Sequence, residues 1–193
     1  MNVTDRINGL AIELQLGPFR ISGINPTPVL AAIHKWIESE GHEFYFPSYN
    51  IVQVILDGTV LAQPGLHPDL NSTLILNLEN LDLVRLANDH RGPVRWFCQR
   101  DPRELVGPML DHYRGTYYRK HLNQLVYSND TDLEFYDLPE GIELNSTLLA
   151  SVCAAREAGI KPETIRAELN QIADGLRRSK SGFSDANSAR TQF

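Results

Sequence analysis

The stretch Ile51-Val-Gln-Val-Ile-Leu-Asp-Gly-Thr-Val-Leu61 decides the fold that the sequence predicts. β-branched and other apolar residues dominate on both sides of Asp57-Gly58, a dipeptide typical of two-residue hairpin turns. The aromatic residues of positions 43–46 also favour a strand. We therefore expect residues 42–62 to be antiparallel.

Further strands are predicted on both sides of this stretch. Apolar or aromatic residues dominate or alternate in each of these strands. Gly17-Pro18 separates residues 10–16 from residues 19–24, and these two segments form a strand pair or one bent strand. A helix is predicted between Thr27-Pro28 and Gly41, and another over 81–87. The additional predicted strands are residues 10–16, 19–24, 74–78 and 95–98.

The second half of the chain has helical periodicity. Asp101-Pro102-Arg103-Glu104 has the order of a capping box with a proline at the first helical position. From Leu105, apolar and aromatic residues recur every four positions as far as His121, which predicts a helix with an interruption near Gly107-Pro108. A strand follows at 133–136. Asn145 then caps a helix, and Pro162 begins the last one.

Together these patterns predict an α+β fold. We expect an antiparallel-rich sheet over residues 8–98 and a helical C-terminal half that ends in a helical hairpin. These patterns divide the chain into three predicted segments: an α+β domain at 1–143, the hairpin at 144–178, and a flexible polar tail at 179–193. The tail is rich in Ser, Gly and Asn, so it cannot bury enough apolar surface to order itself.

Composition excludes several protein classes. With 193 residues and 42% hydrophobic content, the chain can bury a core without disulfides. Cys98 and Cys153 belong to no Cys-x-x-Cys motif, which predicts buried thiols in a reducing compartment. No apolar run reaches the length of a membrane span, and residues 1–6 do not resemble a signal peptide. We expect no membrane partner and an intracellular protein, either cytoplasmic or built into a virion or another assembly.

The net charge of −6 is unevenly distributed. Residues 85–127 carry 8 basic and 4 acidic side chains, whereas 128–150 carry 6 acidic and 0 basic ones. In one interpretation the two blocks pair with each other. In the other, the basic block binds an acidic partner or nucleic acid. Since Tyr113, Tyr117 and His121 share the apolar stripe of the predicted helix, its outward contact patch is Arg114, Tyr118 and Arg119.

The C-terminal tail has one apolar anchor at each end, Phe183 and Phe193. Fixing the backbone of a polar tail costs about 1 to 2 kcal/mol per residue. Two buried rings return only a few kcal/mol. We therefore expect the tail to become ordered on a partner or on a second copy of the chain, with Arg190 contributing to the contact.

Residues 155–170, Ala-Arg-Glu-Ala-Gly-Ile-Lys-Pro-Glu-Thr-Ile-Arg-Ala-Glu-Leu-Asn, contain small and aliphatic residues at a characteristic spacing. The small residues let two helices cross closely, and the Gly permits a left-handed turn.

Over these residues only, the chain resembles the helix-turn-helix of lac-repressor-type and phage-repressor-type DNA-binding proteins. It departs from that family at Ala154, where Leu or Val is usual, and at Glu163 and Glu168, which phosphate repels. The resemblance implies a recognition helix whose DNA contacts come from Lys161, Arg166, Asn170, Arg177 and Arg178. A helical hairpin used only for packing is the alternative.

Templates for catalysis are absent from the sequence. It has no phosphate-binding Gly loop, no nucleophile elbow and no paired-histidine metal motif. Three candidates lack supporting neighbours: Cys98 as a nucleophile, Asp89-His90 as an acid–base pair, and the alternating carboxylates of 132–140 as a metal site. We predict no catalytic residue, no cofactor and no metal.

The function expected from these patterns is that of a non-catalytic interaction protein. It would act as an adaptor, inhibitor or assembly component of phage or mobile-element type, through charge-segregated surfaces that bind another protein or a second copy. One alternative is a nucleic-acid-binding regulator that uses residues 147–180. The other is an enzyme of unrecognised type.

Overall fold

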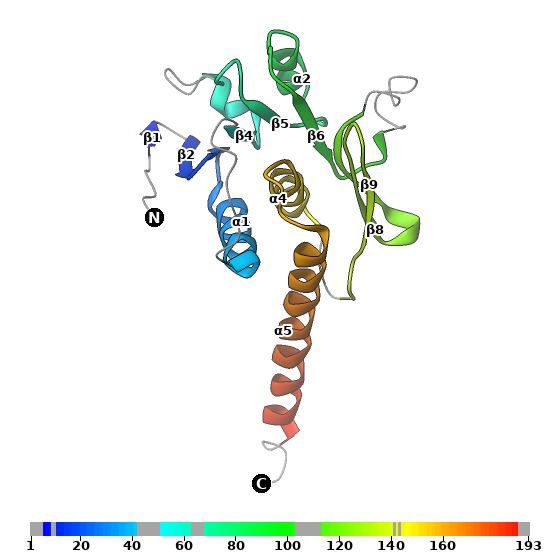
Figure 1. Cartoon of the computed structure of the whole chain (residues 1–193). Helices are drawn as coiled ribbons and strands as arrows, with labels where there is room; N and C mark the ends of the chain where they lie inside the picture. The colour runs from blue at the N-terminus through cyan, green and yellow to red at the C-terminus, as the bar shows by residue number, and fades with distance from the viewer. Residues whose placement is uncertain are drawn as a thin grey trace.

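The computed structural model describes residues 6–8, 11–41, 51–62, 68–102, 113–140, 142 and 144–188. Its centre is a nine-stranded sheet in which the strands lie in chain order (Figure 1). The strands are β1 (Arg6–Asn8), β2 (Ala11–Leu16), β3 (Phe19–Gly23), β4 (Val52–Ile55), β5 (Thr73–Asn77), β6 (Val94–Cys98), β7 (Gly115–Arg119), β8 (Gln124–Ser128) and β9 (Leu133–Asp137).

The sheet is parallel in the middle and antiparallel at both ends. Strands β3 to β7 are parallel neighbours. β1 to β3 and β7 to β9 form antiparallel meanders. The predicted antiparallel-rich sheet is therefore wrong, because the centre of the sheet is parallel, whereas the coarser α+β class is confirmed.

The Asp57-Gly58 dipeptide does not turn a hairpin. Asp57 Oδ1 accepts the N–H of Thr59 (3.0 Å), and the chain enters the 3-10 helix η2 (Gly58–Ala62). The next strand, β5, then pairs with β4 in parallel. All side chains of β4 are buried, which is the pattern of a central parallel strand covered on both faces. The strand predicted at 43–46 lies outside the described residues.

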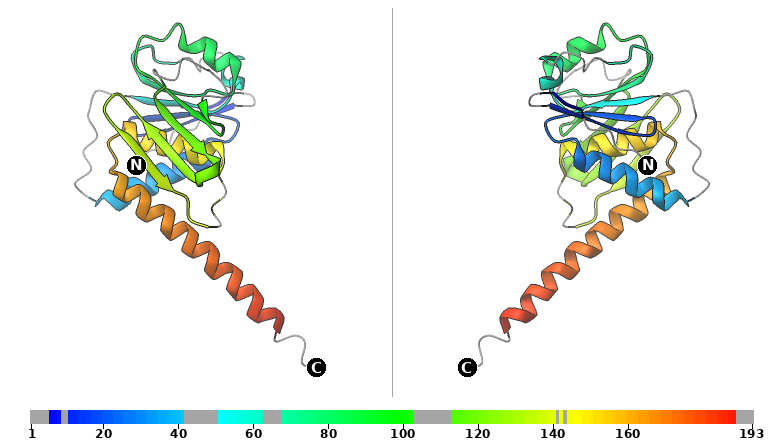
Figure 2. Two further views of the ribbon diagram at one scale, coloured as in Figure 1. Left: turned by 90° about the vertical axis from the view of Figure 1, so that its right-hand side faces the viewer. Right: turned by 90° about the vertical axis from the view of Figure 1, so that its left-hand side faces the viewer.

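Helices cover both faces of the sheet. The inner face packs against α1 (Thr27–Glu40), α4 (Ser146–Glu157) and the start of α5 (Pro162–Ser188), and the outer face against η2 and α2 (Leu81–Ala87) (Figures 1 and 2). Helix α4 is central to the inner core, where residues 149–155 are buried against α1 and strands β4 to β8. Its alanines permit this close approach.

Residues 115–119 form strand β7, so the helix predicted to reach His121 is wrong there. Side chains alternate between the two faces of the sheet: Thr116 Oγ1 donates to the Leu149 carbonyl of α4 (2.8 Å), whereas Tyr117 meets the Tyr113 ring edge-on on the other side. Alternation of β-branched and aromatic residues suits a strand. The beginning of the predicted helix, residues 103–112, lies outside the described part of the chain.

The helical hairpin forms as the sequence predicts. The side chain of Asn145 caps α4 by accepting the Leu148 N–H (2.9 Å), and Gly159 adopts a φ of 89° in the turn. Helix α5 begins at Pro162 and continues to Ser188, into the residues assigned to the tail. None of the described helices is long and apolar enough to cross a membrane.

Helix α1 fixes the direction of α5. Glu40 Oε1 accepts the backbone N–H of Lys161 (2.8 Å) and the hydroxyl of Thr164 (2.7 Å). One turn further along α5, the buried carboxylate of Glu168 pairs with Lys35. Two carboxylates, one on each helix, therefore hold the first turns of α5 on the body.

Candidate functional site

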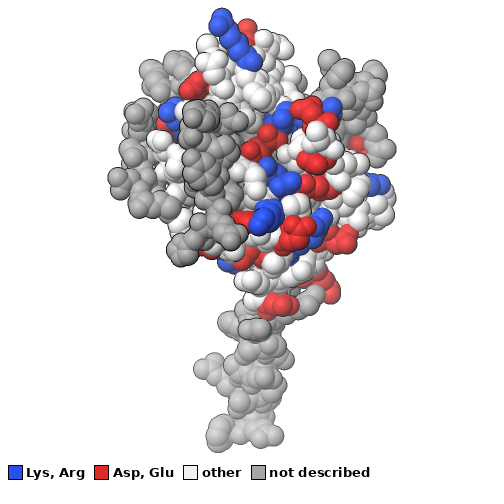
Figure 3. All heavy atoms as spheres, in the orientation of Figure 1, with Lys and Arg blue, Asp and Glu red and all other residues white. Residues whose placement is uncertain are grey.

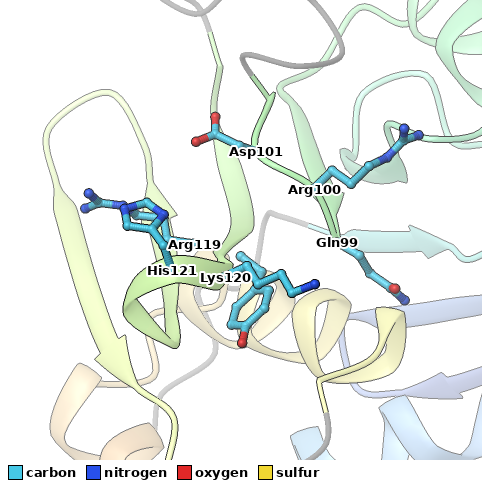
Figure 4. A pocket seen from close by; sticks show the side chains of 7 residues that line it. Gln99, Arg100, Asp101, Arg119, Lys120 and His121 are labelled. Carbon is cyan, nitrogen blue, oxygen red and sulfur yellow. The ribbon is translucent and has the colours of Figure 1, made fainter.

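A pocket of about 350 Å³ opens at the carboxyl ends of the neighbouring parallel strands β6 and β7 (Figure 4). Open α/β sheets bind ligands beyond the carboxyl ends of their strands. Two short segments line the pocket: one follows β6, and the other runs from the end of β7 into the 3-10 helix η4 (Lys120–Leu122). The lining residues are Gln99, Arg100, Asp101, Tyr118, Arg119, Lys120 and His121.

Strand register and a tight turn bring these segments together. Cys98 at the end of β6 pairs with Tyr117 of β7, so the residues that follow each strand leave the sheet side by side. The second segment then reverses at Asn123, which has the left-handed φ of 51° that Asn tolerates. Asn123 donates its N–H to the Lys120 carbonyl (3.2 Å) and accepts the Tyr118 hydroxyl on Oδ1 (2.8 Å). These two hydrogen bonds of Asn123 therefore hold η4 in position at the wall of the pocket.

The pocket carries a net positive charge. Arg100, Arg119 and Lys120 are cations, against the single carboxylate of Asp101. Arg100 is engaged, since its Nε donates to Glu79 Oε1 (2.9 Å). The exposed side chain of Lys120 has no ion pair with any residue that the structure describes. Figure 4 shows Lys120 extending toward the side of Gln99, whereas Arg119 and His121 extend the opposite way.

The N-terminus of α4 adds to this positive potential. Gln99 Nε2 donates to the hydroxyl of Ser146 (2.9 Å), the first residue of α4, so the helix begins next to the pocket. The first turn of α4 contains no acidic residue. The partial positive charge of a helix N-terminus attracts anions. Side-chain cations and the helix end therefore favour the same kind of ligand group, a carboxylate or a phosphate.

Arg119 connects the pocket to an apolar patch on the edge strand β9, which we define as Leu133 and Phe135. The guanidinium carbon of Arg119 lies 5.9 Å from the centroid of the Phe135 ring. Arg119 Nε is buried and has no hydrogen-bond partner in the described part of the chain. Leu133 is 60% exposed and Phe135 40%. Exposed apolar residues beside an Arg are typical of protein–protein interfaces.

The predicted contact residue Arg114 lies elsewhere, in a network of ion pairs. Its Nε is 2.8 Å from Asp130 Oδ1, and Arg95 approaches the same carboxylate at 3.6 Å. Arg95 also pairs with Glu157 of α4 at 2.7 Å. Figure 3 shows positive and negative side chains intermixed on the face of the molecule that it presents. The internal-pairing interpretation is thus confirmed for Arg114, whereas Tyr118 and Arg119 line the pocket.

The residues of the helix-turn-helix resemblance lie along α5. Lys161 precedes the helix, with its Nζ 3.7 Å from the carboxylate of Glu40. The Arg166 guanidinium lies over the Tyr136 ring at 5.1 Å, and Asn170 is exposed. The first helix of the resembled motif, α4, is buried. The side chains of Arg177, Arg178 and Phe183 are outside the described part, as are the whole residues Arg190 and Phe193.

The candidate nucleophile and the acid–base pair do not form a catalytic arrangement among the described residues. Cys98 Sγ donates to the Arg100 carbonyl (3.0 Å), and burial raises the pKa of this thiol to about 12. Burial also raises the pKa of Cys153 well above its ordinary value. Thiols in this state are poor nucleophiles. His90 Nε2 donates to the Ser72 carbonyl (2.7 Å).

The alternating carboxylates of 132–140 do not form a metal site in the described structure. Glu134 is paired with Arg156 (2.6 Å), and Asp132 accepts a hydrogen bond from the amide of Asn129 (3.1 Å). No group of three or more His, Cys, Asp or Glu side chains is arranged to hold a metal ion within the described residues.

Sequence analysis missed five pocket residues. Arg100 and Lys120 are twenty positions apart in the sequence, and they line one pocket only because β6 and β7 are parallel neighbours. The usable signal is a run of polar residues at the end of each strand, at 99–101 after β6 and at 119–121 at the end of β7. The missed residues are Gln99, Arg100, Asp101, Lys120 and His121.

No family model matches this chain, and no curated protein matches it.

Proposed function

We propose that this chain is a non-catalytic interaction protein that binds an acidic segment of a protein partner in the basic pocket between β6 and β7. One observation carries the proposal. Lys120, without an ion pair among the described residues, stands in a net basic pocket next to the N-terminus of α4. A carboxylate placed there would satisfy both the ammonium group and the helix end.

The surroundings of the pocket favour a protein segment over a small anion. Arg119 lies in the wall of the pocket and over the ring of Phe135 at once. An extended acidic segment with an apolar side chain would therefore contact both the pocket and the patch of Leu133 and Phe135. Burial of the apolar side chain supplies affinity, while the charges raise the association rate and the specificity.

Two of the contact residues predicted from the sequence belong to this proposal: Tyr118 and Arg119, which line the pocket, contact the partner directly. Arg114 precedes β7, at the end of that strand remote from the pocket, and its guanidinium is paired with Asp130, so it is not part of the proposed contact. The tail residues Phe183, Arg190 and Phe193 remain proposed contacts with a partner or a second copy.

A nucleic-acid-binding regulator is the second candidate, and the exposure of Asn170 on α5 favours it. Arg166 counts against it, since its guanidinium is already stacked on Tyr136 and hydrogen-bonded to the Phe135 carbonyl (3.3 Å). Both candidates use positive charge, so both predict binding that weakens with salt. They differ in the basic residue whose substitution should weaken binding, which is Lys120 for the acidic segment and Arg166 for nucleic acid.

The test is the affinity of a fluorescently labelled peptide of Asp and Glu with one central Phe, measured by anisotropy at low salt. Lys120→Glu should weaken binding at least about tenfold, which corresponds to about 1.4 kcal/mol. The matched control is Arg85→Glu, the same charge change at an exposed position of α2 on the outer face. The control should bind like the unmodified protein.

Two results would contradict the proposal. One is equal binding by Lys120→Glu and Arg85→Glu, since charge at the pocket would then be irrelevant. The other is binding of duplex DNA in preference to the peptide, with a loss in Arg166→Ala, which would support the regulator instead.

A further inference from the structure

Strand β9 is the last strand of the sheet, so one of its two edges faces away from β8. Leu138, the residue after β9, donates its N–H to the Asn123 carbonyl (3.0 Å), and these two residues are therefore a hydrogen-bonded pair of the antiparallel ladder. Bonded and non-bonded pairs alternate along such a ladder. Leu133, Phe135 and Asp137 consequently direct their backbone N–H and C=O groups away from β8, along the free edge.

The hydrogen-bonding groups of this edge are largely unused within the described part of the chain. Arg166 of α5 is the described residue that contacts them, since its Nη2 donates to the Phe135 carbonyl (3.3 Å). A carbonyl oxygen can accept a second hydrogen bond. The outward N–H groups of Leu133 and Phe135 have no acceptor among the described residues. A row of such groups is a template for one further strand.

The side chains of β9 also favour pairing with an added strand. Leu133 and Phe135 are exposed, and they lie on the same face of the sheet as Tyr117, because Phe135 pairs with Val126 and Val126 with Tyr117. Edge strands that resist pairing commonly carry Lys or Pro. The five residues of β9 include neither. The free edge therefore suits an extended segment that has apolar side chains on this face.

The charges beside the edge define the other property of that segment. The register places Arg119 opposite Gln124 and Gln124 opposite Asp137, so the basic pocket lies at the end of the sheet where β9 ends. Arg119 Nε is buried without a hydrogen-bond partner in the described chain, and Lys120 has no described ion pair. Asp137 is exposed, so carboxylates of a bound segment would lie beyond it, at the pocket cations.

We propose that the acidic segment of the partner binds as an additional strand, antiparallel to β9, with its N-terminal end in the pocket. The acidic character of the segment rests on the proposed function. An antiparallel neighbour continues the meander of β7 to β9, and its N-terminal end meets the carboxyl end of β9, which is the pocket end. Its apolar side chains would cover Leu133 and Phe135, and its backbone would bond to the outward groups of these two residues.

The test uses the full-length chain and a fluorescently labelled peptide with Asp and Glu at its N-terminal end, followed by Phe and Val alternating with Thr. The apolar residues then lie opposite Leu133 and Phe135, so their N–H groups face β9, whereas those of Thr face solvent. N-methylation of the apolar positions should weaken binding at least about tenfold, because main-chain hydrogen bonds are lost. The matched control is the same peptide N-methylated at the Thr positions, which should bind like the unmodified peptide.

Hydrogen exchange of the backbone amides, measured by NMR, gives a second readout. The amides of Leu133 and Phe135 should exchange at least about tenfold more slowly when the peptide is bound, because each acquires an acceptor. The amides of Glu134 and Tyr136 face β8 in the free chain and should change little.

Equal binding of the two methylated peptides overturns the added strand, as does unchanged exchange at Leu133 and Phe135 in the saturated complex. Slowing at these amides that depends on protein concentration, without peptide, also overturns it, because a second copy would then occupy the edge. Lys120→Glu tests the proposed function separately. A loss of affinity in Lys120→Glu with equal binding of the methylated peptides removes only the added strand, whereas unchanged affinity in Lys120→Glu removes the acidic-segment pocket.

Discussion

Arg114 and Asp130 form an ion pair of 2.8 Å that joins the basic and the acidic segments of the chain. The pair fixes the residue before β7 to the turn between β8 and β9. It lowers the pKa of Asp130, chiefly through the hydrogen bond from Arg114. Part of the uneven charge along the sequence therefore forms ion pairs within the fold, whereas the exposed Lys120 has no ion pair with any described residue.

The deeper part of this network should matter most for stability. Glu157 accepts hydrogen bonds from Arg95 Nε and from the Tyr127 hydroxyl, both at 2.7 Å, and its side chain is 10% exposed. Glu157→Ala leaves Arg95 buried without its main partner, so unfolding in urea should show a loss of about 3 kcal/mol. Asp130→Ala, at the exposed end of the network, should change stability little. Equal losses in the two variants would contradict this account.

Local signals predicted the elements that depend on neighbouring residues. Asn145 caps α4, Gly159 turns the hairpin, and Pro162 begins α5, because capping and turn chemistry act within a few positions. The predicted helix over 81–87 is α2, and the strand predicted at 133–136 is β9, which extends one residue further to Asp137. These predictions needed no knowledge of the rest of the chain.

Strand direction could not be predicted in the same way. Asp57-Gly58 has the composition of a hairpin turn, yet β4 is buried on both faces and continues into η2. The pairing of β4 with β5 is decided by that burial, which is a property of the whole sheet. The pocket follows the same rule, since Arg100 and Lys120 come together only through the parallel pairing of β6 with β7.

Stability should fall in acid through the carboxylates that hold α5. Burial alone would raise the pKa of Glu168, but hydrogen bonds from Lys35 and Ser39 and the charge of Lys35 outweigh it and lower this pKa. The pKa of Glu40 is also lowered, because hydrogen bonds from Thr164 and Lys161 outweigh burial. A lowered folded-state pKa means stability that is present above the ordinary value of 4.5 and lost as the pH falls through the folded value.

The measurement is the urea midpoint as a function of pH. The double variant Glu40→Gln with Glu168→Gln should be less stable than the unmodified chain at neutral pH and should lose less stability below pH 4.5. A pH dependence that is the same in both proteins would assign acid sensitivity to other carboxylates.

Gly115 should be irreplaceable at the start of β7. It has a φ of 134°, and a Cβ there would lie 1.8 Å from the Trp96 carbonyl oxygen. Gly115→Ala should therefore cost about 3 kcal/mol or more, because strain and overlap with β6 add. Gly175 provides the matched control, since nothing lies within 4 Å of a Cβ at that exposed helical position. Gly175→Ala should raise stability by about 1 kcal/mol. Similar thermal midpoints for the two variants would show that the close approach of β6 and β7 is not required.

The most direct test of the central claim is the map of backbone amide chemical shifts when the isotope-labelled full chain is titrated with the acidic, Phe-containing peptide. The pocket proposal predicts that the largest changes fall on Gln99 to Asp101 and Tyr118 to His121, with smaller ones at Leu133 and Phe135. Asn170 on α5 should not move. Changes centred on α5, or a saturating titration that leaves both pocket segments unperturbed, would contradict it.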